Sequence, residues 1–172
     1  MRKYGFIPLL LLTAILQTTL LSRMTINDVK PDLMLMLVVA QTVFGGAVAG
    51  MVWGLVGGLF LDLLSRGSFD ALVLVLPFVA FVAGTMTGES LRHRFVLPLI
   101  LAFLGSLLQG GLIILALQLA NLPVFWTVSL ISTVVQGATI NTALMPLVYL
   151  AFNRWGPRKH GLHASHWNWK GS

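Results

Sequence analysis

The sequence has no cysteine and very few charged residues. Without cysteine, the chain forms no disulfide and offers no thiolate ligand or nucleophile, which excludes thiol redox chemistry and cysteine-dependent catalysis. Asp, Glu, Lys and Arg together make up only 9% of the residues, whereas soluble domains carry about 25%. Hydrophobic residues make up 57%, a balance typical of chains that fold inside a bilayer. The sequence therefore predicts an integral membrane protein.

The sequence also lacks the short motifs of common enzyme classes. It contains no GxSxG, no HExxH and no phosphate-binding glycine loop followed by lysine, and no buried pair of carboxylates follows from spacing. We expect no enzymatic activity, no cofactor and no metal site. The net charge of +6 does not predict nucleic-acid binding, because the basic residues lie at the ends of apolar runs. The 172 residues predict one helical membrane bundle over 1–153 and a basic cytoplasmic tail over 154–172.

Charged and turn-forming residues divide the apolar sequence into candidate spans. The uncharged run from Leu33 to Leu61 contains 29 residues, about 43 Å as one helix, which is long for one span and short for two. The pair Gly45-Gly46 predicts a break within it, and Pro31 and Asp32 suit the first turn of the helix that precedes the break. We predict an all-α bundle with six spans, near residues 4–22, 32–45, 46–64, 71–88, 95–120 and 124–152.

Basic residues orient this bundle, because loops rich in Lys and Arg stay in the cytoplasm. With six spans and the N-terminus inside, eight basic residues are cytoplasmic and three, Arg23, Lys30 and Arg66, lie outside. A five-span alternative, with one long second helix and the N-terminus outside, also gives eight against three. The double glycine and the basic start favour six spans with both termini in the cytoplasm.

Four glycines and one aspartate follow each other at intervals of four residues: Gly46, Gly50, Gly54, Gly58 and Asp62. Such a row allows close approach of another helix. We interpret it mainly as a packing seam within the bundle, with a docking face for a partner as the alternative. Asp62 lies just before the polar stretch SRGS, so we expect a structural carboxylate near the outer interface that can reach water or Arg66, rather than a proton-transfer group.

Other polar residues have weaker functional signals. Asn141 lies deep in the last span, where hydrogen bonding between helices is the usual role of such a side chain. The tail contains His160, His163 and His166, which would bind a metal only if the tail folds. We expect the tail's tryptophans and basic residues to contact lipid head groups instead.

The stretch KPDLMLMLVVAQTVFGGAVAGMVWGLVGGLFLDLLSRGSFDAL and the later NTALMPLVYLAF resemble the rod shape-determining MreD family. The resemblance is sharpest at Pro31-Asp32 and from Gly58 to Gly67, and Asn141 and Pro146 fit the last span of the family. It implies a six-helix bundle similar to the substrate-binding subunits of energy-coupling-factor transporters, in the bacterial cytoplasmic membrane. It also implies a scaffold without chemistry of its own, acting with MreC, MreB, RodA and a penicillin-binding-protein synthase.

A second function remains open, that of a solute-binding membrane subunit of an energy-coupling-factor-type transporter. It requires a polar cavity inside the bundle. The candidate lining residues are few, chiefly Gln109, Gln118, Gln136 and Asn141, and this scarcity favours the scaffold.

Overall fold

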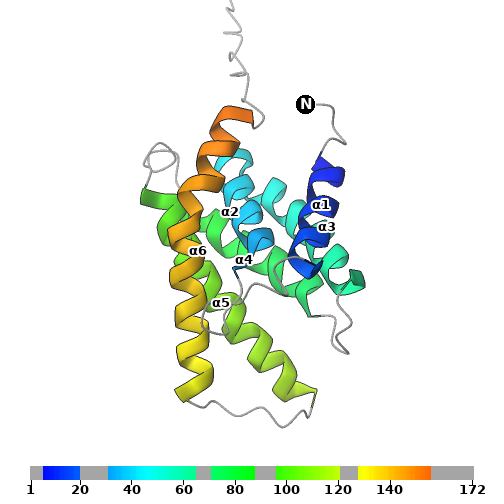
Figure 1. Ribbon diagram of the computed structural model, residues 1–172, viewed down its shortest axis with the longest axis vertical. Helices are drawn as coiled ribbons and strands as arrows, with labels where there is room; N and C mark the ends of the chain where they lie inside the picture. The colour runs from blue at the N-terminus through cyan, green and yellow to red at the C-terminus, as the bar shows by residue number, and fades with distance from the viewer. Residues whose placement is uncertain (1–5, 20–30, 65–70, 88–95, 121–127, 156–172) are drawn as a thin grey trace, which may run out of the picture.

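The computed structural model describes residues 6–19, 31–64, 71–87, 96–120 and 128–155. Within these ranges the chain forms six helices and no strand, so the predicted all-α class and the number of helices are confirmed. The helices, labelled in Figure 1, are α1 (Phe6–Thr19), α2 (Leu33–Gly45), α3 (Ala47–Leu64), α4 (Leu72–Met86), α5 (Val96–Leu119) and α6 (Val128–Trp155).

Gly46 separates α2 from α3. Its φ of 93° and ψ of 172° lie in a region that side chains with a Cβ rarely adopt. The N–H of Gly46 donates to the carbonyl of Thr42 (2.9 Å), and the carbonyl of Gly46 accepts from the N–H of Gly50 (3.0 Å). One glycine thus ends α2 and begins α3, and the apolar run that starts at Leu33 holds two helices instead of the single long helix of the five-span alternative.

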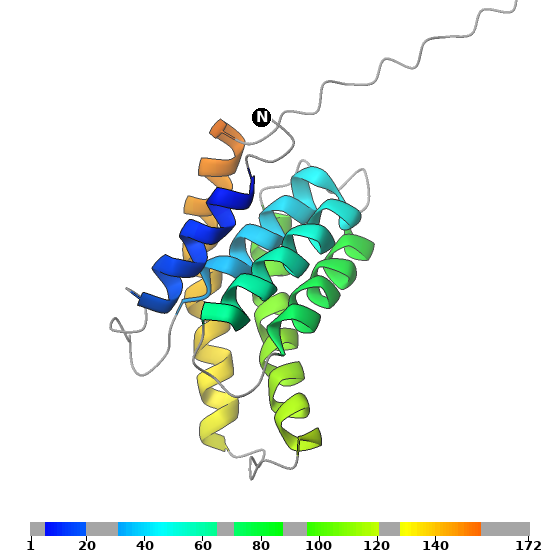
Figure 2. The same cartoon turned by 90° about the vertical axis from the view of Figure 1, so that its right-hand side faces the viewer.

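The helices differ greatly in length. Three are long and apolar enough to cross a membrane: α3, α5 and the Ser129–Phe152 part of α6. The other three contain 13 to 15 residues, about 20–22 Å each, which is less than the ~30 Å of bilayer hydrocarbon. Figure 2 shows the consequence: the C-terminal half of α5 and the N-terminal half of α6 project together beyond the four other helices.

The short helix α2 lies at the centre of the molecule. It contacts all five other helices, and nine of its thirteen residues are buried. A helix that is apolar all round suits such a position, because no face has to meet water. The remaining helices bury one side against α2 or each other and expose apolar side chains on the other, as expected where lipid is the solvent. The start of α2 is therefore surrounded by other helices, and its polar groups need partners there.

Candidate functional site

Asp32 is the N-cap of α2. Its Oδ1 accepts a hydrogen bond from the backbone N–H of Leu35 (2.9 Å), which satisfies one of the amides that have no partner at a helix start. Pro31 therefore precedes the cap, whereas the sequence suggested a place in the first helical turn. The carboxylate also lies at the positive end of the helix dipole. Asp32 therefore lies at the end of α2 where other helices can form hydrogen bonds with it.

Two glutamines from different helices donate to the same carboxylate. Gln17 of α1 donates from Nε2 to Oδ1 (3.0 Å), and Gln109 of α5 donates from Nε2 to Oδ2 (2.5 Å). The Oε1 of Gln17 in turn accepts from the backbone N–H of Met34 (3.0 Å). These hydrogen bonds connect the start of α2 to α1 and α5.

Asn141 completes this cluster from α6. It is 4% exposed; its Oδ1 accepts from the backbone N–H of Asp32 (2.8 Å), and its Nδ2 donates to Oγ of Ser106 (2.9 Å). The hydroxyl of Ser106 in turn donates a hydrogen bond to the carbonyl of Ala102 (2.7 Å). Asp32, Gln17, Gln109, Asn141 and Ser106, which we call the Asp32 cluster, thus join α1, α2, α5 and α6.

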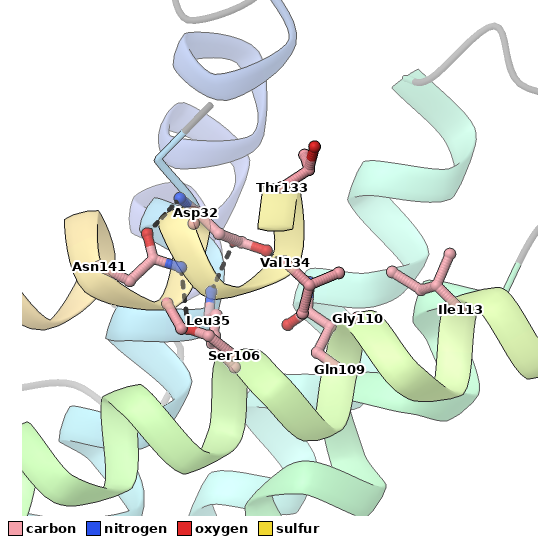
Figure 3. Close-up of a pocket in the computed structure, with 11 residues that line it drawn as sticks. Asp32, Leu35, Ser106, Gln109, Gly110, Ile113, Thr133, Val134 and Asn141 are labelled. Atoms are coloured by element: carbon pink, nitrogen blue, oxygen red, sulfur yellow. Dashed lines mark hydrogen bonds between the residues drawn. The ribbon is translucent and has the colours of Figure 1, made fainter. Parts of the chain in front are cut away.

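A cavity of about 290 Å³ opens beside the Asp32 cluster, between the start of α2 and the middle of α5 and α6 (Figure 3). No described residue that lines it carries a positive charge. Gln109 is only 8% exposed, and no described residue donates a hydrogen bond to its Oε1. The lining residues are Asp32, Leu35, Ser106, Gln109, Gly110, Ile113, Thr133, Val134, Gly137, Ala138 and Asn141.

Some residues of the Asp32 cluster are predicted from the sequence and others are not. Asn141, Asp32 and Gln109 were singled out, and the structure brings them together. Gln17 and Ser106 were missed, although a polar side chain inside an apolar span is itself a signal, because burial without a partner is costly. Of the four residues suggested for a solute cavity, only Gln109 and Asn141 line this one.

The glycines of α3 allow two other helices to approach closely. A Cβ on Gly54 would lie 2.8 Å from the backbone N of Pro77, and one on Gly58 would lie 2.5 Å from the carbonyl oxygen of Leu72, both in α4. A Cβ on Gly50 would overlap Thr42 of α2. Gly46 lies before the helix, as described above. The contacts of this row are made within the chain, and they are divided between α2 and α4.

Asp62 caps a helix other than its own. It is 8% exposed, and its two carboxylate oxygens accept from the backbone N–H groups of Leu72 (3.3 Å) and Val73 (2.8 Å) at the start of α4. The expected partner Arg66 lies outside the described residues. The carboxylate therefore joins the end of α3 to the start of α4, a role that spacing along α3 alone does not reveal.

An aromatic cluster lies in the half of the molecule away from the Asp32 cluster. Phe6 stacks on Trp53 (ring centroids 5.5 Å apart), Trp53 meets Phe152 edge-on (5.6 Å), and Phe44 packs against Phe152 (6.1 Å) and Tyr149 (5.1 Å). Such pairs contribute about 0.5–1.5 kcal/mol each beyond the area that they bury. They join α1, α2, α3 and α6 near the end of α2, and sequence reasoning did not identify them.

In the parts of the chain that the structure describes, no three His, Asp or Glu side chains gather. The three histidines of the tail lie outside the described residues. The described polar side chains bind the backbone at helix starts and line a cavity.

Comparison with known proteins identifies the family. Neither the curated proteins nor the solved structures gave a match. The model of one family, described as rod shape-determining protein MreD, matches residues 2–155, which include all six helices. The chain belongs to the MreD family of rod shape-determining proteins.

Proposed function

We propose that this protein is a non-enzymatic scaffold of the bacterial elongation complex, in which it binds MreC and supports lateral peptidoglycan synthesis together with MreB, RodA and a penicillin-binding-protein synthase. It lies in the cytoplasmic membrane, crosses it several times and has both termini in the cytoplasm. The observation that carries the proposal is the match of the MreD family over residues 2–155, because this family determines rod shape.

The packing of the helices supports a scaffold with a rigid interior. Gly54 and Gly58 are in contact with α4, and Gly50 with α2, so the glycine row is filled by the protein itself. A partner's transmembrane helix has to use the outer apolar faces instead. The projecting parts of α5 and α6 offer such a face, which exposes Leu115, Leu119, Ile131 and Val135.

The cavity beside Asp32 is the specific observation that favours a second function, a solute-binding subunit of an energy-coupling-factor-type transporter. Against it stands the lining, in which six of the eleven described residues are apolar or glycine. Gln136, another candidate for the lining, is exposed on α6. The scaffold therefore remains the better-supported function.

Affinity purification of the full chain from bacterial membranes in mild detergent separates the two functions. The scaffold predicts recovery of MreC in a stable complex, with RodA and the synthase as weaker companions. A solubilised membrane protein of similar size with the same tag controls for non-specific recovery. Recovery of an ATPase module with its coupling subunit, and no MreC, would reject the scaffold.

A further inference from the structure

Helix α6 is the least buried of the three helices that are long enough to cross a membrane. Only 17% of its membrane-length stretch is buried inside the molecule, against 39% for α3 and 33% for α5. It is also the least apolar of the three, with a mean hydropathy of 1.3 against 1.9 and 2.3. Polar side chains in membrane helices ordinarily face other helices. The least apolar helix should therefore be the most buried, and α6 is the reverse.

The polar residues of α6 gather on the side that faces away from the bundle. Five exposed residues follow each other at alternating intervals of three and four, and each is polar or alanine; we call them the α6 face: Ser129, Ser132, Gln136, Thr139 and Ala143. At about 100° per residue they lie opposite Asn141 and Met145, which are buried in the bundle. Figure 1 shows α6 along one edge of the molecule, with this side open.

The outward side of α3 shows what a face adapted to lipid looks like. Its exposed residues also recur at intervals of three or four, but every one of them is large and apolar: Val48, Met51, Val52, Leu55, Leu59 and Leu63. The α6 face contains no such side chain. Small and polar residues are instead typical of faces where two membrane helices pack closely and form hydrogen bonds with each other.

Much of the α6 face lies at membrane depth. Gln136 lies eighteen residues before Arg154 in the last turn of α6, about 27 Å along the helix, and the bilayer hydrocarbon is ~30 Å thick. The hydroxyls of Ser132 and Thr139 donate to carbonyls of α6 itself, but no described residue forms a hydrogen bond with the amide of Gln136. Lipid offers this amide no partner, whereas a second helix on this face does.

The chemistry of the α6 face suits its own counterpart. Two copies of a chain enter the membrane in the same orientation, so a two-fold axis between them is normal to the membrane and brings each residue onto itself. None of the five residues is charged, so no like charges meet. The amide of Gln136 both donates and accepts, so it can pair with the same amide of a second copy, and Ala143 allows close approach.

We propose that a second copy of this chain covers the α6 face, with the two α6 helices packed side by side and parallel. Alternating intervals of three and four residues are the spacing of a seam between two such helices, which cross at about 20°. A single polar side chain on such a seam fixes the register of the pair, and Gln136 takes that part here. This dimer does not depend on the scaffold function proposed above.

Disulfide cross-linking tests the dimer, because the chain has no cysteine of its own. The full-length variants Ser132→Cys and Gln136→Cys are oxidised in bacterial membranes and are expected to form disulfide-linked pairs of this chain. Ile131→Cys is the matched control, because Ile131 is exposed at the same depth as Ser132 but lies about 100° away around the helix. We expect at least fivefold more cross-linked dimer from Ser132→Cys than from Ile131→Cys.

Three outcomes of this experiment would overturn the proposal. Equal cross-linking at the three positions would show chance collisions. Cross-links from Gln136→Cys to other membrane proteins alone would show that a different partner covers the face. Rapid labelling of Gln136→Cys by a membrane-impermeant maleimide, without cross-linking, would show that the face lies in water.

Energy transfer between purified, fluorescently labelled copies in liposomes tests the dimer without any other protein. Ala143→Phe adds bulk to the α6 face and is expected to weaken association at least fivefold, whereas Leu55→Phe on the outward side of α3 is expected to leave it unchanged. Both positions are exposed, so we expect both variants to keep the helix content of the unsubstituted protein, which circular dichroism measures. Equal association of the two variants, or no energy transfer in the unsubstituted protein, would overturn the proposal.

Discussion

The polar residues of the spans act chiefly on backbone amides. The first N–H groups of every helix lack partners within the helix, and lipid supplies none. Asp32 and Gln17 satisfy the start of α2, and Asp62 satisfies the start of α4. These side chains lie where a short buried helix would otherwise leave donors unpaired. Their place at helix starts explains acidic residues inside the bundle without any proton transfer.

Gly54 provides the sharpest test at the scale of one residue. We expect Gly54→Leu to destabilise the bundle by about 1–3 kcal/mol, because its Cβ alone would lie 2.8 Å from the backbone N of Pro77. A backbone atom cannot move aside as the end of a flexible side chain does. Thermal unfolding in detergent measures the change, and MreC recovery after purification is the second readout.

Val52→Leu is the matched control for Gly54→Leu. Val52 lies on the same helix but is 45% exposed, so an added methylene group meets lipid instead of protein. We expect an unchanged unfolding temperature and an unchanged yield of complex. If Gly54→Leu behaves as Val52→Leu does, the contact between α3 and α4 is not what holds these helices together.

At the scale of the elements, the predicted number of helices is confirmed, because charged residues and the double glycine separate the apolar runs. Which helices pack against each other was harder to predict from the sequence. Steps of four residues turn a helix by about 40° beyond a full turn, so a row of glycines with this spacing winds around α3. Gly50 therefore meets α2, whereas Gly54 and Gly58 meet α4. Gly57, seven residues from Gly50, also meets α2, at Met34, and was not singled out.

The candidate site was predictable only in part for the same reason. A polar residue in an apolar span indicates that a hydrogen-bond partner lies nearby, and Asn141 and Gln109 are two such residues. Its partner is set by the crossing of helices far apart in sequence: Gln109 and Asp32 are 77 residues apart, and Asn141 and Asp32 are 109 residues apart. No periodicity within one helix contains that information.

The break between α2 and α3 is tested at Gly46. We expect Gly46→Ala to cost about 1–3 kcal/mol, because its φ of 93° and ψ of 172° force a Cβ into a strained conformation. The measurement is the unfolding temperature of the purified variant. Val48→Ala, at a position that is exposed near the start of α3, is the control and should change little. Equal stability of the two variants would mean that the chain does not need this backbone conformation.

At the scale of the whole molecule, the unequal helix lengths make the two ends of the bundle different. The aromatic cluster joins α1, α2, α3 and α6 at one end. At the other end the short helices stop near the Asp32 cluster, while α5 and α6 continue (Figure 2). The proposed orientation places the aromatic end toward the cytoplasm and the projecting pair toward the outside, where a cell-wall complex works.

Reporter fusions after residues 3 and 68 test this orientation. Six helices return the chain to the side from which it started, so we expect the fusion after residue 3 to report a cytoplasmic position and the fusion after residue 68, between α3 and α4, to report the outside. The basic residues support this, since eight of eleven are then cytoplasmic. A fusion after residue 155, following α6, is the internal control and should also report the cytoplasm. An outside position for residue 3 with residue 68 inside, and residue 155 still in the cytoplasm, would reject six spans, because three helices lie between residues 68 and 155.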